Sequence, residues 1–315
     1  MLAYLIRRLA FAVFLVFAVS SASLVLARLA PGDYVSQSMG LEAGRETIEE
    51  ARARLGLNRS IADQYRAWIA GAMRLDFGRS LLFDRPVADL IPERAANTAI
   101  LAVTALAVAT LIGLPLGVLT GSRKSGILTG TIRAASLVLL SMPPLLTSLF
   151  LVFVAARTGW FPVGGMSAAG AAGGATLDLL RHLVVPAAAL AMPLAAMFER
   201  LQAQAMSDVV GQPYVLATLA RGVPRSRVVW RDALKAALRP VAALYGLVVG
   251  TLLSGSFAVE VITAWPGLGR LMLDALRARD VYLVAGCAAA GSLFLAAGTL
   301  MSDAALALVD PRTSD

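Results

Sequence analysis

The chain has 315 residues, of which 58% are hydrophobic and 15% charged, and its formal net charge is +8. A water-soluble domain carries about 25% charged residues, so this composition excludes one and indicates a membrane protein. The positive charge does not indicate nucleic-acid binding, because the arginines are scattered between apolar runs. The single cysteine and single histidine exclude an internal disulfide framework and a multi-cysteine metal site.

Six uncharged apolar stretches approach or exceed the roughly 20 residues that cross the hydrocarbon layer of a bilayer as a helix. We therefore expect an all-α, polytopic membrane protein with six transmembrane helices. In chain order the stretches are 9–27, 98–120, 134–156, 182–198, 241–259 and 281–302. A further uncharged segment, 158–177, is rich in glycine and alanine, and we interpret it as an extracytoplasmic loop.

The N-terminal part, 1–97, is expected to combine one transmembrane helix with an extracytoplasmic region, and 98–315 to form a five-helix core. The mixed-charge stretch 42–68 is interpreted as one amphipathic helix. Its apolar face would consist of Leu55, Ile61, Tyr65, Trp68 and Ile69. Loop carboxylates such as Asp33 and Asp280 are interpreted as helix caps or ion-pair partners rather than as ligands of a solute.

The distribution of basic residues predicts the orientation of the helices, because cytoplasmic loops carry the excess of lysine and arginine. With the N-terminus inside, the inner segments hold 13 basic and six acidic residues, whereas the outer segments are nearly balanced. Both termini are therefore expected in the cytoplasm. Small residues four apart, at Gly113 and Gly117 and at Gly246 and Gly250, predict close packing between helices.

The inner segment 199–240 carries the clearest local signals. Proline suits the first turn of a helix and glycine the residue after its end. Pro213 is therefore expected to begin a short helix that Gly222 ends, and Pro224 to begin a second helix running towards Leu238. This second helix carries Arg225, Arg227, Arg231, Lys235 and Arg239. Such a pair of helices either binds anionic lipid headgroups or docks into the groove of a partner protein, and the residues themselves leave both alternatives open.

The segment resembles the coupling motif of permeases from binding-protein-dependent ATP-binding-cassette (ABC) importers. That motif combines a short alanine-rich helix, a fixed glycine and, farther on, an apolar residue and a proline. The matching residues here are Ala217, Gly222, Leu238 and Pro240, whereas Thr218 and Leu219 depart from the motif. Further stretches are similar to the branch that carries dipeptides, oligopeptides, nickel and glutathione. They include APGD at 30–33, DFGRS at 76–80 and, most specific, WPGLGRL at 265–271.

The resemblance implies a permease subunit of a bacterial inner-membrane importer for a peptide or peptide-like solute, with nickel, glutathione or another small solute as alternatives. It implies a second homologous permease, two cytoplasmic ATPase subunits and an extracytoplasmic substrate-binding protein as partners. The ATPase-coupling residues would be Tyr214, Ala217, Ala220, Gly222, Pro224, Arg231, Leu238 and Pro240. The outer gate or the seat of the binding protein would comprise Pro266, Gly267, Leu268, Gly269 and Arg270, for which a tight turn with glycines at positive φ is the structural alternative.

Ser141, Met142 and Pro143, followed by Pro144, interrupt the third stretch and are candidates for the lining of the path, since irregular backbone is tolerated where it faces a cavity. The chain lacks the Gly-x-x-x-x-Gly-Lys-Ser/Thr loop. We therefore expect a non-catalytic subunit without a cofactor of its own, with ATP and magnesium bound by the partner ATPases. A self-sufficient secondary transporter is less favoured, because neither an inverted repeat nor a mid-membrane charge is evident.

Overall fold

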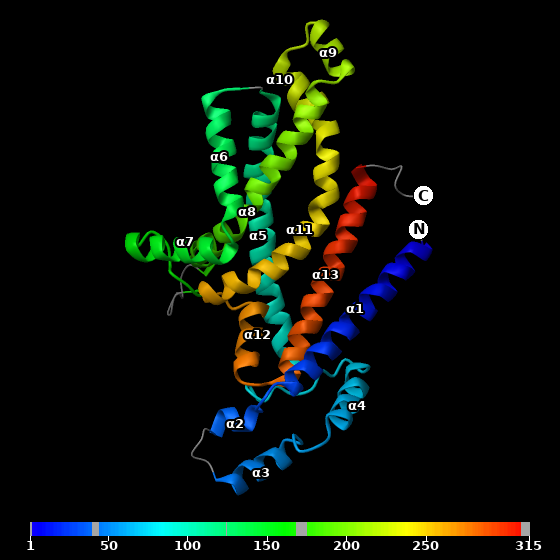
Figure 1. The fold of residues 1–315 in the computed structure, drawn as a ribbon, viewed down its shortest axis with the longest axis vertical. Coiled ribbons are helices and arrows are strands. Elements are labelled where there is room, and N and C mark those ends of the chain that lie inside the picture. The colour runs from blue at the N-terminus through cyan, green and yellow to red at the C-terminus, as the bar shows by residue number, and fades with distance from the viewer. Residues whose placement is uncertain (1, 40–43, 124, 168–174, 310–315) are drawn as a thin grey trace. The chain divides into compact units, whose positions relative to one another are not determined.

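The computed structural model of the chain describes residues 2–39, 44–123, 125–167 and 175–309, and its regular elements in these ranges are helices (Figure 1). The all-α fold expected from the apolar stretches is therefore confirmed. The contacts divide the chain into two compact units, which are described separately. Unit 1 contains Ala99–Trp265 and Ala297–Asp315, and unit 2 contains Leu2–Thr98 and Pro266–Ala296. The division into 1–97 and 98–315 stays a prediction.

Four helices in the described ranges are long and apolar enough to cross a membrane unbroken, and up to six spans result if each of two bent helix pairs counts as one. The unbroken helices are α1 (Leu2–Leu29), α5 (Val87–Ser122), α8 (Ala175–Val210) and α13 (Val281–Val309). The number of spans therefore agrees with the expected six only when the bent pairs are included.

Unit 2 also contains four short helices: α2 (Tyr34–Met39), α3 (Arg45–Arg54), α4 (Ile61–Ala72) and α12 (Leu268–Arg277). The expectation of one amphipathic helix over 42–68 is wrong, because α3 and α4 are separate. Gly56 stops α3 in the left-handed conformation, at φ +67°, and the N–H of Leu57 donates to Arg52 O at 2.9 Å. This pattern is a Schellman C-cap, after which Ser60 caps the new helix.

The apolar residues of α3 and α4 do not share one face. Trp68 is buried, 4% exposed, in a cluster with Leu24 of α1 and Ala285 of α13, and α4 packs on α1. Leu55 instead packs against a second cluster, which consists of Val35, Ala51 and Leu57. Ile61 is 40% exposed. The two short helices therefore bury separate small cores.

Two carboxylates hold unit 2 together. Asp280, which is fully buried, accepts hydrogen bonds from Ser80 Oγ at 2.6 Å, Leu82 N at 3.0 Å and Leu283 N at 3.1 Å. It therefore caps α13 and fixes a loop 200 residues away in sequence. This agrees with its interpretation as a cap.

Asp33 begins α2 and joins it to α3. Its carboxylate accepts from Ser36 N at 2.9 Å and pairs with Arg52 Nε at 2.6 Å. Partial burial would raise the pKa of Asp33, but the hydrogen bonds from Arg52 and Ser36 outweigh burial and lower the pKa to about 2. The expectation that Asp33 is a cap and ion-pair partner is thus met by its contacts.

Unit 1 contains most of α5, the end of α13, and the whole of α8. Its other elements are α6 (Ile127–Ser141), α7 (Pro144–Thr158), α9 (Pro213–Ala220), α10 (Arg225–Arg227), the π-helix η1 (Val228–Ala233) and α11 (Leu234–Ile262). The core lies between α5, α8 and α11, where Phe198 and Trp265 are fully buried. Phe198 stacks on Tyr245 with ring centroids 5.0 Å apart, and the Tyr245 hydroxyl shares a 2.7 Å hydrogen bond with Thr110. These contacts join the three helices.

Glycines let α5 approach α8 closely. A Cβ atom at Gly113 or Gly117 would lie 2.5 Å or 2.6 Å, respectively, from a carbonyl oxygen of α8, and one at Gly121 would also collide with that helix. The close packing predicted from the spacing of Gly113 and Gly117 is therefore confirmed. The same spacing at Gly246 and Gly250 stays a prediction, because Gly246 lies outside the residues whose surroundings are described.

The third apolar stretch, 134–156, does not form one straight helix. The chain bends by 106° between α6 and α7, and α7 packs across α8 and α11 (Figure 1). The bend has a local cause, because a residue before proline is driven out of the helical conformation. Met142 and Pro143, each followed by a proline, are both extended, with ψ of 115° and 148°. The interruption was expected at this place, and the bent pair of helices corresponds to the third predicted stretch.

Candidate functional site

The segment 199–240 is mostly helix rather than a connecting loop. Helix α8 continues beyond the expected end of the fourth stretch as far as Val210. The expected limits 182–198 were therefore too short, because charged and amide residues after Phe198 ended the apolar run without ending the helix. A single turn connects α8 to α9, and from Arg225 onward the chain is helical through η1 into α11.

Helix α9 begins and ends where the proline and glycine signals predict. Pro213 occupies its first turn, and the helix stops at Ala220. Gly222 follows with φ +83°, and its N–H donates to Leu219 O at 2.9 Å. A Cβ atom at Gly222 would meet nothing within 4 Å, so the backbone conformation and not crowding accounts for glycine here.

One face of α9 is apolar and exposed. Val215 alone is buried, while Tyr214 and Leu216 are 50% and 54% exposed. Tyr214, Ala217 and Ala220 are spaced three apart, so they share a face, and all three are exposed. The helix has no charged residue and stands at one end of unit 1 (Figure 1). An apolar helix face presented in this way has the chemistry of a helix that docks into a groove.

The second helix of the segment is attached to the end of α5. The Arg225 guanidinium donates to Ser122 O, the last residue of α5, at 2.8 Å. Around this contact lies a hollow of about 650 Å³, which Arg123 and the exposed Trp230 also line. This contact joins the first turn after Pro224 to the end of α5.

The predicted coupling residues fall into two groups. Those from Tyr214 to Arg231 lie on α9, on the turn after it and on η1, which packs against α9. Leu238 and Pro240 lie farther along, inside α11, where Leu238 is half-buried and Pro240 exposed. The basic residues of this second helix are exposed: Arg225, Arg227, Arg231, Lys235 and Arg239. The structure thus brings the first group together and leaves the second apart.

A buried polar cluster at the same end of unit 1 was missed from the sequence. Thr120 Oγ1 of α5 donates to Glu199 Oε1 of α8 at 2.5 Å, and Arg133 of α6 donates to Thr120 O at 3.0 Å. The second carboxylate oxygen of Glu199 and the side-chain amide of Gln202 are buried without a partner among the described residues. The charge of Glu199 at the edge of an apolar run indicated a polar contact there, but Thr120, its partner 79 residues away, was not predictable from the sequence.

The segment 266–270 is not a glycine turn. Gly267 has φ −99° and ψ −172°, so it is the extended N-cap of α12, and the next three residues form the first turn of that helix. The left-handed residue nearby is Ala264, with φ +52°. The expectation of glycines at positive φ is therefore wrong, because a helix begins here.

This start of α12 is anchored to α5 within unit 2. Asn97 Nδ2 donates to Pro266 O at 2.9 Å, and Leu268 N donates to Thr98 Oγ1 at 2.8 Å. Helix α12 then buries Leu268, Leu271 and Ala275. Its assignment to an outer gate or a binding-protein seat stays a prediction.

The bend between α6 and α7 places the third group of predicted residues at the surface of unit 1. Ser141 is exposed and donates to Leu137 O within its own helix, at 2.9 Å. Met142 is half-buried and Pro143 exposed. Whether these residues line a path also stays a prediction.

Comparison with known proteins agrees with this arrangement. Residues 113–315 match the family described as the inner membrane component of binding-protein-dependent transport systems, and residues 1–102 match the N-terminal family of such membrane components. The chain is 32% identical, over 99% of both sequences, to the oligopeptide transport system permease protein AppB of Bacillus subtilis (strain 168). It is also 32% identical to the glutathione transport system permease protein GsiC of Escherichia coli (strain K12), over 89% of this chain and 88% of the relative. The resemblance found in the sequence is confirmed, and the chain belongs to the family of inner membrane components of binding-protein-dependent transport systems.

Proposed function

We propose that the chain is one of two related permease subunits of an ABC importer and forms part of the path for a peptide or peptide-like solute. The similarity to an oligopeptide permease over 99% of both chains supports this solute class. Glutathione, itself a peptide-like molecule, is the second candidate, because the glutathione permeases are equally identical over a slightly shorter region. Nickel and other small solutes have no such support among these relatives.

The exposed apolar face of α9 is the observation that carries the proposal. An uncharged helix with Tyr214, Ala217 and Ala220 exposed offers an apolar face to a partner, and the excess of basic residues favours a cytoplasmic location for this end of unit 1. A cytoplasmic ATPase is the partner that an importer supplies. In this account the chain itself is non-catalytic, and ATP and magnesium are bound by two ATPase subunits.

The contacts of unit 1 provide a mechanical route from α9 to the membrane helices. When the ATPases close on ATP, α9 moves with them, and the Arg225–Ser122 contact transmits the movement to α5. The Thr120–Glu199 hydrogen bond and the glycine packing then make α5 and α8 move as one body. Nucleotide drives this change only in so far as it binds the closed arrangement more tightly than the open one.

The remaining assignments complete the importer. Both termini lie in the cytoplasm, the chain resides in the bacterial inner membrane, and an extracytoplasmic binding protein delivers the solute near α12. Selectivity then resides mainly in the binding protein.

Solute uptake and ATP hydrolysis in proteoliposomes containing the complete importer test the proposal. Ala217→Asp places a charge on the apolar face of α9. It should abolish both solute uptake and the stimulation of ATP hydrolysis by the solute. Ser207→Asp is the matched control, because Ser207 is exposed on α8 but outside that face, and it should preserve both. If Ala217→Asp is as active as the control, α9 is no ATPase-docking helix.

A further inference from the structure

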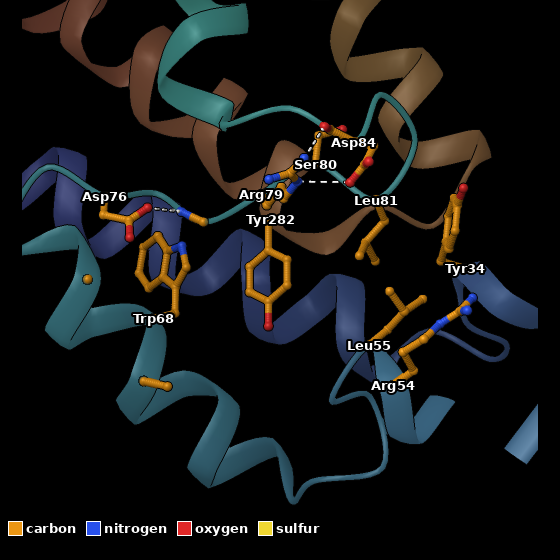
Figure 2. A pocket seen from close by; sticks show the side chains of 13 residues that line it. Tyr34, Arg54, Leu55, Trp68, Asp76, Arg79, Ser80, Leu81, Asp84 and Tyr282 are labelled. Carbon is orange, nitrogen blue, oxygen red and sulfur yellow. Dashed lines mark hydrogen bonds and ion pairs between the residues drawn. The ribbon is translucent and has the colours of Figure 1, made fainter. Parts of the chain in front are cut away.

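Unit 2 contains a cavity of about 770 Å³ that the transport cycle described above does not use (Figure 2). It lies between α4, the loop at 76–84, the start of α13, the start of α2 and the end of α3. Binding sites for small molecules have volumes of about 300–1,000 Å³, so the cavity is large enough for a short peptide. The rings of Trp68 and Tyr282 form its aromatic wall (Figure 2).

The indole N–H of Trp68 is an unsatisfied donor in this wall. Trp68 is 4% exposed, and its Nε1 atom has no hydrogen-bond partner among the described residues. A buried donor without a partner costs free energy, so most such groups are paired in native proteins. The atom itself is covered, so a carbonyl or carboxylate oxygen of a bound molecule would become its acceptor once the indole ring turns towards that molecule.

Opposite charges lie at the two ends of the cavity. Asp76 lies at the end beside Trp68, whereas Arg54 lies at the far end, beyond Leu55 (Figure 2). One oxygen of Asp76 accepts from Gly78 N at 2.9 Å. Arg54 is exposed, and no ion pair joins it to another residue in the described part of unit 2. Each end therefore retains charge for a ligand.

The charges in the middle of the cavity are already neutralised. Arg79 Nε pairs with Asp84 Oδ1 at 2.8 Å, and its terminal nitrogen donates to Asp84 O at the same distance. The cavity thus has a negative end, a neutral aromatic middle and a positive end. This order complements a molecule with an ammonium group at one end and a carboxylate at the other.

We propose that this cavity binds a short zwitterionic peptide, with the ammonium group at Asp76, the carboxylate at Arg54 and a peptide carbonyl on the Trp68 N–H. The inference rests on the proposed function, because it assigns to this chain a contact with the same solute class. A segment from the middle of a binding protein has neither charged terminus, so the two charged ends favour a free peptide as the occupant. With the predicted topology the cavity faces the extracytoplasmic side and holds cargo before it enters the membrane.

Calorimetric titration of the purified importer with trialanine, without nucleotide or binding protein, tests the inference. Trialanine should bind at least tenfold more tightly than N-acetyl-trialanine or trialanine amide. Arg54→Gln should abolish the preference over the amide, and Asp76→Asn the preference over the acetylated peptide. Trp68→Phe keeps an aromatic ring but removes the donor, and should weaken binding of all three. Arg74→Gln, exposed and outside the cavity, is the control and should behave as the unaltered chain.

Equal binding of free and capped peptides would overturn the proposal, and so would the absence of any binding. It would also be overturned if the Arg54 and Asp76 variants bound trialanine normally but lost association with the binding protein, since the cavity would then be a docking surface. If the importer takes up peptide but its cavity binds none, the assignment of the cavity is refuted and the proposed function stands. Binding by an importer that transports no peptide refutes the proposed function and leaves the cavity assignment intact.

Discussion

The close packing of α5 on α8 leads to a quantitative prediction at Gly117. A Cβ atom placed there would lie 2.6 Å from Glu199 O and from Gln202 Cβ, about 0.8 Å short of the 3.4 Å at which ordinary contact begins. Both atoms are fixed to the α8 backbone, so the two helices must separate to admit a methyl group. Overpacking of this kind costs about 1–3 kcal/mol, and we expect Gly117→Ala to lower the free energy of unfolding by that amount.

Gly130 of α6 offers the matched control. It is exposed, and a Cβ atom there meets nothing within 4 Å. Alanine is favoured over glycine inside a helix by about 0.5–1 kcal/mol, so Gly130→Ala should raise the free energy of unfolding. Titration of the purified chain with SDS in mixed micelles, followed by circular dichroism, measures both variants. A Gly117→Ala variant as stable as Gly130→Ala would refute the packing of α5 on α8.

Two further predictions concern unit 2. Asp280→Ala removes the acceptor of three hydrogen bonds and should lower the free energy of unfolding by about 2–4 kcal/mol. The amide of Leu82 should then exchange its hydrogen faster, and unchanged exchange at this amide would contradict the prediction. Because the pKa of Asp33 is lowered to about 2 in the folded chain, from 3.8, its ion pair with Arg52 stabilises the fold above pH 4 and is lost as the pH falls towards 2. The pair is partly exposed, so the contribution is about 1 kcal/mol. Unfolding measured from pH 5 to 2 should show a smaller loss for Arg52→Gln than for the unaltered chain, and equal losses would exclude the linkage.

The elements that local chemistry controls were predictable from the sequence. Pro213 and Gly222 determine the ends of α9 because a proline ring and a left-handed glycine act on their own backbone. The bend after Ser141 was located for the same reason. Its angle of 106° was not, because α8 and α11 determine where α7 packs.

Contacts between residues that are far apart in the chain could not be predicted from the sequence. The polar cluster joins Thr120 to Glu199 across 79 positions, and Asp280 meets Ser80 across 200. The splitting of 42–68 was a different kind of error, since the Gly56 stop signal was present but was overridden by the apolar pattern around it. The exposed face of α9 could be identified only from the structure, because the packing of the helix determines that Val215 is buried and Tyr214 is exposed.

The central claim is that α9 and the turn after it couple an ATPase to transport, and a substitution series at Gly222 tests it most directly. Gly222 has φ +83° with open space around it within this subunit, so here the backbone conformation and not crowding by the subunit itself constrains the residue. Asparagine adopts this conformation readily, alanine at a cost of about 1–2 kcal/mol, and proline not at all. Solute transported per ATP hydrolysed in proteoliposomes should therefore be near normal for Gly222→Asn, reduced for Gly222→Ala and abolished for Gly222→Pro, with equal membrane insertion. A Gly222→Pro subunit that transports normally would contradict the account and leave the segment as a lipid anchor.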